Sequence, residues 1–373
     1  MIPYSKQSVH HEDLEAIKEA LFSSHLTQGQ RVSEFESLVA ARAGAPYALA
    51  LNSATSALYC AYAALGIGQN DEVITTPISF VATTNMLLAL GAKPVFCDIL
   101  PNGNIDPSKI EPLITPRTKA IVSVDYAGQS VDVDSIAHIA KKHGLLWISD
   151  SSHAFGARVG DSPVGSFADA TIFSFHAIKP ITTAEGGAVV FKDAEAHQKA
   201  QLLHSHGVQK KALWNSEVEF LGFNFRLNEL GAALGISQYR WLDSFIAKRD
   251  KIARLYDSLF ADSPYCTTLV REAHLTTTHH LYPVFLARSL WCSKEELFVQ
   301  LHEKGIGVQV HYKPINSYAL YGADSSATPV ANDFYLSELS LPCHQEMSEE
   351  QAYEIAKTFK ALCAEKDSDA CAT

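Results

Sequence analysis

An aspartate and a lysine near the middle of the chain, Asp150 and Lys179, have the chemistry of a cofactor site. Asp150 ends the apolar stretch 145–149, and Lys179 lies in Phe173-Ser-Phe-His-Ala-Ile-Lys-Pro180, ahead of Glu185-Gly-Gly187. The amine of a lysine can form a Schiff base with an aldehyde, and a buried carboxylate can keep a pyridine nitrogen protonated, so that the ring withdraws electrons. A lone lysine would more often be a surface residue. With Asp150 upstream and a glycine pair behind it, Lys179 instead predicts a pyridoxal phosphate site.

A phosphate-binding position is predicted where a strand turns into a helix, at Asn52-Ser-Ala-Thr-Ser56. The free N–H groups and the positive dipole end of a helix N-terminus favour a phosphate. Ala54 and Thr55 would donate from the backbone and the hydroxyl, and Ser174 would add a second hydroxyl. Asn and Ser are also ordinary helix caps, so only the predicted cofactor site in the same chain favours the phosphate.

Further aromatic and polar residues are candidates for the rest of the site. Phe80 opens a predicted helix, where its ring would stack on the pyridine, although phenylalanine at a helix start is more often a core residue. His153 follows Asp150 by three residues and would reach the phenolic oxygen of the cofactor. Tyr126 follows another strand end, where open α/β sheets bind ligands, and the amide of Asn224 could bind phosphate or close a loop.

Two more histidine-containing segments stand out. His311-Tyr-Lys-Pro314 ends a predicted strand near the C-terminus and gathers polar groups of the kind that line a binding edge. His176 lies three residues before Lys179, and its position assigns it no role.

Short apolar stretches alternate with helical ones from Tyr47 onward. This pattern is typical of a mostly parallel α/β sheet with both faces covered by helices. Seven strands are predicted, at 47–51, 72–75, 94–98, 120–125, 145–150, 170–175 and 188–191. The predicted helices span 11–22, a stretch ending near 42, 54–65, 80–89, 108–114, 134–143 and 194–204.

A second, smaller domain is predicted at the C-terminal end, because 373 residues exceed the usual size of one domain. A long helical stretch, 228–260, with a turn near Leu242, leads into it. The expected domains are therefore 1–240, which binds the cofactor, and 241–373. The small domain would hold strands near 281–286 and 308–312, helices near 294–304 and 349–364, and a frayed tail over 366–373.

Composition limits the class of protein. Hydrophobic residues at 47% and charged residues at 19% indicate a globular core, and a net charge of −11 without a basic block argues against nucleic acid as the main partner. The most apolar windows, such as 48–67, are interrupted by polar residues, and the N-terminus lacks a secretion signal, so no membrane association is expected. Seven scattered cysteines without metal-ligand spacing are typical of a reducing cytoplasm, and no metal site is expected.

At these motifs the chain resembles the DegT/DnrJ-type sugar-nucleotide aminotransferases over nearly its whole length. The matching segments are Asn52-Ser-Ala-Thr55, Thr76-Pro-Ile-Ser-Phe-Val-Ala-Thr83, Asp150-Ser-Ser-His-Ala154, and Lys179 with Glu185-Gly-Gly187. The resemblance implies the type I fold of PLP-dependent transferases, like that of aspartate aminotransferase. It implies a large domain with a mostly parallel seven-stranded sheet, a small C-terminal α/β domain, and a homodimer with shared active sites.

The resemblance also implies roles for individual residues. Lys179 would bond to the cofactor and carry protons, and Asn224 would reach the cofactor from the other subunit. Two positions depart from the commoner family pattern: His153 stands where many members have glutamine, and Pro180 follows the lysine. Neither removes a required group. The nucleotide-sugar groove would be lined by Tyr4, His25, Leu26, Thr27, Ser53, Gln309, Val310, His311, Tyr312 and Tyr321.

Segments 123–128, 173–187, 224–229 and 310–314 are most similar to the family branch of pseudaminic acid biosynthesis. The implied reaction is amination of C4 of UDP-2-acetamido-2,6-dideoxy-β-L-arabino-hexos-4-ulose by L-glutamate. Amination of the C5-epimeric UDP-4-keto sugar, or of another nucleotide 3- or 4-keto sugar, is the alternative, because those enzymes would share every cofactor residue. A sugar dehydratase of this fold would carry histidine at Lys179, and a non-catalytic pyridoxal-binding protein would lack the lysine or the aspartate. An NAD-binding enzyme is disfavoured because no GxGxxG follows the first strand.

Overall fold

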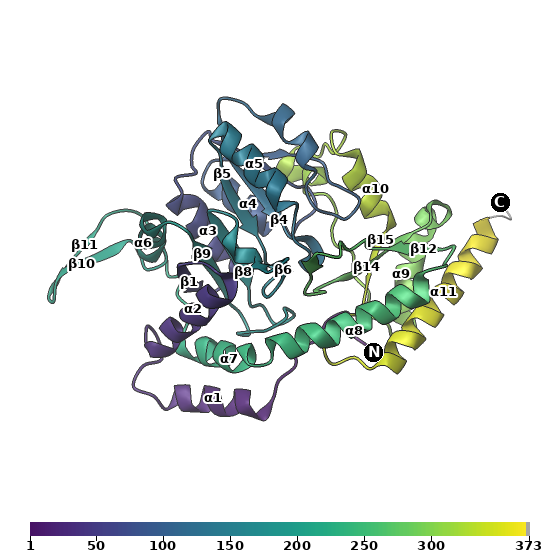
Figure 1. Cartoon of the computed structure of the whole chain (residues 1–373), viewed down its shortest axis with the longest axis horizontal. Helices are drawn as coiled ribbons and strands as arrows, with labels where there is room; N and C mark the ends of the chain where they lie inside the picture. The colour runs from purple at the N-terminus through teal and green to yellow at the C-terminus, as the bar shows by residue number, and fades with distance from the viewer. Residues whose placement is uncertain (371–373) are drawn as a thin grey trace.

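A seven-stranded sheet forms the centre of the larger domain (Figure 1). The computed structural model describes residues 1–370, and the strand order is β1-β9-β8-β5-β4-β2-β3. Neighbouring strands from β8 to β3 are parallel, whereas β9 is antiparallel to both β1 and β8. The predicted α/β fold with a mostly parallel seven-stranded sheet is therefore confirmed. The strands are β1 (Tyr47–Leu51), β2 (Glu72–Thr75), β3 (Lys93–Phe96), β4 (Thr118–Val124), β5 (Leu146–Asp150), β8 (Ala170–Ser174) and β9 (Gly187–Phe191).

Both faces of this sheet are buried, as the apolar strands predicted. In β1, Leu49 and Leu51 belong to one core, and Ala48 and Ala50 belong to another. The alternation follows from the two-residue period of a strand, which sends successive side chains to opposite faces. The first face is covered by α3 (Ala54–Ala64), α4 (Ala82–Ala89) and α6 (Ala194–Leu203), and the second by α2 (Gln30–Ala43), α5 (Val133–His143) and α7 (Glu229–Tyr239). Helix α1 (His11–Leu21) packs on α7.

Helix α8 (Leu242–Phe260) connects the two domains and belongs to both cores. Its side chains Phe245 and Ile246 pack into the large domain, whereas Tyr256 and Phe260 pack into the small one. Figure 1 shows α8 running from the end of α7 to the C-terminal helix. The expected helical stretch 228–260 is thus two helices with a break at 240–241, and the domain boundary near 240 stays a prediction.

The small domain is an antiparallel sheet packed against helices. Its strands lie in the order β12-β14-β15, and its core includes Leu297, Leu301 and Phe359. These elements are β12 (Cys266–Thr268), β14 (Tyr282–Leu286), β15 (Glu338–Leu341), α9 (Lys294–Glu303), α10 (Pro329–Ser337) and α11 (Glu349–Ala370). Two smaller sheets lie elsewhere, β6 (Arg158–Val159) with β7 (Ser162–Pro163) and β13 (Leu275–Thr276), and the projecting hairpin of β10 (Val208–Ala212) and β11 (Asn215–Val218) (Figure 1).

Several predicted elements differ from the structure. The helix expected at 108–114 is two short 3-10 turns, because Pro112 has no N–H with which to continue a helix. The strand expected at 308–312 forms only an isolated bridge at Gln309, since the N–H of His311 donates to the carboxylate of Glu338 and not to a strand. Helix α4 begins at Ala82, later than expected. The tail expected over 366–373 continues α11 through residue 370, and its remainder lies outside the described residues.

Three further observations hold for residues 1–370. None of the helices there combines the length and the apolar composition that a membrane crossing needs. No group of three or more histidine, cysteine or acidic side chains there is arranged to hold a metal ion. The cysteines in this part of the chain are all free.

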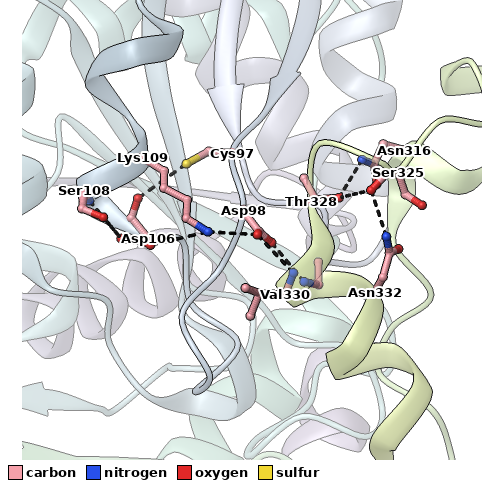
Figure 2. A network of polar contacts seen from close by, with 11 residues as sticks. Cys97, Asp98, Asp106, Ser108, Lys109, Asn316, Ser325, Thr328, Val330 and Asn332 are labelled. Carbon is pink, nitrogen blue, oxygen red and sulfur yellow. Dashed lines mark hydrogen bonds and ion pairs between the residues drawn. The ribbon is translucent and has the colours of Figure 1, made fainter.

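A buried carboxylate joins the first turn of α10 to the large domain (Figure 2). Asp98 follows β3 and accepts hydrogen bonds from the N–H groups of Val330 and Ala331 at 3.1 and 3.0 Å. These are the second and third residues of α10, whose N–H groups have no partner within the helix. Lys109 donates to the same carboxylate at 3.0 Å. Asp98 therefore acts as the N-terminal cap of a helix more than two hundred positions away.

Replacing Asp98 by alanine should weaken this connection. We expect a loss of about 0.5–2 kcal/mol of stability, the usual range for a lost helix cap, and a lower melting temperature. Amide hydrogen exchange should become faster in the first turn of α10. Asp106→Ala, which removes a cap from a local 3-10 turn in the same loop, is the control and should leave exchange in α10 unchanged. Unaltered exchange in Asp98→Ala would contradict the assignment.

Candidate active site

A cavity of about 580 Å³ opens at the carboxyl ends of the parallel strands. Val124, Asp150 and Ser174, which end β4, β5 and β8, all line it. Ligands of open α/β sheets bind at this edge. The predicted site residues that line the cavity are Tyr4, Ser53, Ala54, Thr55, Phe80, Asp150, His153, Ser174, Lys179, Gln309, Val310, His311 and Tyr312.

Other predicted residues do not line this cavity. They are His25, Leu26, Thr27, Asn224 and Tyr321. The hydroxyl of Tyr321 contacts Thr84 and Asn85 instead. Their binding roles stay predictions. Tyr126, which was expected at the site, is fully buried, and its hydroxyl donates to the carbonyl of His311 at 2.7 Å. A buried tyrosine hydroxyl needs such a partner, so Tyr126 supports the wall of the cavity from behind.

Lys179 lies in the loop between β8 and β9 with its amine inside the cavity. Its Nζ lies 3.2 Å from Nε2 of His280. Burial lowers the pKa of Lys179 to about 7, against the opposing influence of Asp150, and the nearby Arg249 lowers it further. A large fraction of this amine is therefore neutral near pH 7, which is the form that attacks a carbonyl.

The carboxylate of Asp150 is buried, and both of its oxygens accept hydrogen bonds from neighbouring residues. Thr83 donates to Oδ2 at 2.6 Å, while Ser152 donates to Oδ1 from its hydroxyl at 2.6 Å and from its N–H at 3.2 Å. These donors hold the carboxylate in one orientation at the floor of the cavity. Thr83 was not among the predicted residues, although it ends the segment 76–83 that carried the resemblance.

A cradle for a phosphate is formed where α3 meets β9. Ser53 is the N-cap of α3 and accepts from the N–H of Ser56 at 3.1 Å, and Ala54 begins the helix. Gly187 lies so close that a Cβ there would be 2.4 Å from the backbone nitrogen of Ala54. A side chain at this position would fill the space in front of the helix N-terminus. The buried hydroxyl of Ser174 faces the same cavity.

Two residues are placed to contact a flat ring in the cavity. Nε2 of His153 lies 3.2 Å from the hydroxyl of Tyr312, while its buried Nδ1 has no partner among the described residues. Burial, together with Lys179, holds the pKa of His153 well below its usual value. Phe80 lines the cavity with 62% of its surface exposed, which is unusual for a large apolar ring. An amine, a fixed carboxylate, an unpaired histidine nitrogen, an exposed ring and an anion cradle together fit pyridoxal phosphate.

The opposite wall is organised by a chain of hydrogen bonds beneath His311. Ser340 donates its hydroxyl proton to Oε1 of Glu338 at 2.6 Å and lies 2.8 Å from Nδ1 of His311. With Glu338 ionised, the single hydroxyl proton of Ser340 goes to its carboxylate, so Nδ1 of His311 donates to Ser340 and Nε2 is left as an acceptor. Burial lowers the pKa of His311 to about 3, so the ring is neutral.

Several contributors to the site have no motif in the sequence. His280 follows another histidine ahead of β14, Glu338 and Ser340 lie in β15, and Arg249 lies in α8. Only the adjacent pair His279-His280, before an apolar strand, could have drawn attention to one of them.

Comparison with known proteins gives consistent results. The chain matches the DegT/DnrJ/EryC1/StrS aminotransferase family over residues 7–360. It is 47% identical over 367 residues to the UDP-4-amino-4,6-dideoxy-N-acetyl-beta-L-altrosamine transaminase of Helicobacter pylori, with 96% of this chain and 98% of the relative covered. The transaminase of the same name from Campylobacter jejuni serotype O:2 is 44% identical, with 97% of each chain covered.

Solved structures show the same fold. Helicobacter pylori PseC, an aminotransferase involved in the biosynthesis of pseudoaminic acid, superposes with a TM-score of 0.94 at 46% identity, covering 98% of this chain and 99% of that one. A sugar aminotransferase from Streptococcus pneumoniae in its PLP form superposes with a TM-score of 0.93 at 29% identity, again covering 98% and 99%. The expected type I fold and the expected cofactor, pyridoxal phosphate, are therefore confirmed.

The lowered pKa of Lys179 predicts how the apoprotein captures pyridoxal phosphate at different pH values. Since only the neutral amine attacks the aldehyde, the rate should rise with pH and level off above about pH 7, and not rise on toward about pH 10 as for an ordinary lysine. Stopped-flow absorbance of the cofactor measures this rate. Lys179→Ala should show no covalent capture, and a wild-type rate that still rises above about pH 9 would disprove the assignment.

Proposed function

Because this chain belongs to the DegT/DnrJ/EryC1/StrS aminotransferase family, we propose that it aminates C4 of a UDP-linked 4-keto-6-deoxy amino sugar. The proposed acceptor is UDP-2-acetamido-2,6-dideoxy-β-L-arabino-hexos-4-ulose, the donor is L-glutamate, and the product is UDP-4-amino-4,6-dideoxy-N-acetyl-β-L-altrosamine. The observation that carries the proposal is that Lys179, whose pKa burial lowers to about 7, lines the same cavity as Asp150. The 47% identity to a transaminase named for that product supports the choice of sugar.

The cofactor would be held by residues from both edges of the cavity. Bound pyridoxal phosphate supplies an electron-withdrawing ring that stabilises negative charge on the carbon next to the reacting nitrogen. Asp150 would hold a proton at the pyridine nitrogen, and His153 would contact the ring oxygen through its unpaired Nδ1. Phe80 would cover one ring face, and the N-terminus of α3 with Thr55 and Ser174 would bind the phosphate.

Lys179 would perform the proton transfers of both half-reactions. Its neutral Nζ would take a proton from Cα of glutamate and, in the second half-reaction, deliver one to C4 of the sugar. Because one amine in one position serves both steps, the proton arrives on a single face of the sugar carbon. Substitution of the lysine should therefore remove turnover and not only weaken binding.

The sugar would bind against the wall that comes from the N-terminal arm and the small domain. Tyr4, Gln309 and Tyr312 line this wall, and His311 offers Nε2 as an acceptor for a sugar hydroxyl. His25, Leu26, Thr27 and Tyr321 do not line the cavity, and we propose that they bind the nucleotide part of the substrate. These assignments are part of the proposal.

We also propose a homodimer whose subunits share active sites. Asn224 is exposed and does not line the cavity of its own chain, so its predicted contact with the cofactor requires a second subunit. The projecting hairpin β10–β11 carries Leu213, which is fully exposed, and Trp214, which is 87% exposed. Apolar side chains exposed together in this way are typical of an interaction surface. A cytoplasmic location is likewise proposed, and the free cysteines support it.

The acceptor can be tested with two UDP-linked 4-keto-6-deoxy sugars that are epimeric at C5. With L-glutamate as donor, we expect kcat/KM to favour the L-arabino epimer by roughly tenfold or more, since groove contacts alone separate the two. Lys179→Ala is the inactive control. Preference for the other epimer would show that the enzyme belongs to the pathway that uses that sugar. Failure of both would point to another nucleotide 3- or 4-keto sugar.

The shared site can be tested by mixing two defective variants. Asn224→Ala should lose activity in isolation, and Lys179→Ala should be inactive. In a hybrid dimer, the subunit with Lys179 would receive Asn224 from the other subunit, which restores one complete site. Random reassortment should recover about a quarter of wild-type activity. No recovery, with hybrid formation verified by mass spectrometry, would show that Asn224 does not act across the interface.

A further inference from the structure

The amine of Lys179 has one hydrogen-bonding partner in the described part of the chain, and it is not the carboxylate. Nζ lies 3.2 Å from Nε2 of His280. No ion pair between Lys179 and any carboxylate forms within residues 1–370, although Asp150 shares the cavity. His280 is 3% exposed and lines the same cavity.

We propose that His280 is a positioning residue that holds the free amine of Lys179 in place whenever the amine is not bonded to the cofactor, and that Arg249 fixes the backbones that carry the two side chains. The inference rests on the proposed role of Lys179 as the cofactor-bonding amine. A hydrogen bond to His280 would keep the freed amine at the reacting carbon and prevent it from turning toward Asp150.

A neutral His280 can hold the amine of Lys179 without occupying the lone pair of that amine. Its ring is deeply buried, and this burial, followed by the influence of Lys179, holds its pKa well below the usual value. Nδ1 of His280 has no partner among the described residues. A neutral ring that carries its proton on Nδ1 offers the lone pair of Nε2 to an N–H of the Lys179 amine. The amine then donates, and its own lone pair stays free to attack a carbonyl.

Arg249 connects the segment that carries Lys179 with the segment that carries His280. It is fully buried and forms no ion pair with a carboxylate in the described chain. Its guanidinium instead donates to backbone carbonyls of His280 at 3.4 Å and Ile178 at 3.5 Å, and to that of Cys343 at 2.8 Å. Ile178 directly precedes Lys179. Arg249 therefore holds the backbone next to Lys179 and also the backbone of His280.

The backbone of His280 is held on its other side as well. Its N–H donates to the carbonyl of Ala127, in the turn after β4, at 3.0 Å. The ring packs against that of His153 with centroids 4.4 Å apart. The imidazole therefore has little freedom to leave the amine, which is what a positioning residue requires.

The test compares a covalent and a non-covalent ligand on the apoprotein. Capture of pyridoxal phosphate depends on the amine of Lys179, whereas pyridoxamine 5′-phosphate fills the same cavity without a bond to it. His280→Phe keeps an aromatic ring but removes Nε2, and His280→Gln keeps a polar group. His279→Gln is the matched control, because the neighbouring His279 pairs with Asp250 at 3.0 Å and does not line the cavity.

We expect His280→Phe to capture pyridoxal phosphate roughly tenfold or more slowly, the scale of one hydrogen bond to a reacting group, with nearly unchanged affinity for pyridoxamine 5′-phosphate. His280→Gln should recover part of the rate, and His279→Gln should match wild type with both ligands. Capture by His280→Phe at the wild-type rate would overturn the proposal. A parallel loss of pyridoxamine 5′-phosphate affinity would also overturn it, because His280 would then only shape the cavity. If the wild-type protein captures no pyridoxal phosphate, the proposed function itself fails.

Discussion

The site depends on keeping an amine neutral in the same cavity as a carboxylate. A lysine and an aspartate in low dielectric would normally pair and stay charged, which would leave the lysine unable to attack a carbonyl. Here Thr83 and Ser152 donate to the two oxygens of Asp150, so the carboxylate is held and stabilised without the amine. The amine of Lys179 faces the imidazole of His280, and the buried charge of Arg249 opposes a further positive charge nearby.

The rest of the architecture brings these groups to one place. The parallel strands β4, β5 and β8 deliver their last residues to one edge of the sheet, and the N-terminus of α3 reaches that edge because Gly187 has no side chain. The small domain adds His280 and His311 from the other side. Neither domain alone contains a complete cavity, which explains why so many of the long-range hydrogen bonds described above cross between them.

The sequence predicted those parts of the site whose signal is local. Asp150 and Ser174 stand at strand ends, Lys179 lies in the loop that follows β8, and all three belong to recognisable motifs. A strand end in an α/β sheet is a known ligand position. Arg249 could not be predicted, because it lies among charged neighbours in a helix and resembles a solvent-facing cation until α8 is folded against both cores. The strand expected at 308–312 fails for a similar reason. The N–H of His311 donates to the carboxylate of Glu338, which is distant in the sequence. The residues of the segment itself therefore could not predict that contact.

Helix α8 also limits where this protein can be divided for domain exchange with a relative. Phe245 and Ile246 complete the core of the large domain, while Tyr256 and Phe260, about three to four turns further on, complete the core of the small one. A chimera joined near residue 240 would supply the large domain with foreign side chains, and one joined after α8 would do the same to the small domain. The two halves are therefore not interchangeable modules. Recombination with a relative would preserve both cores only if the junction lay within the helix, between the two groups of side chains.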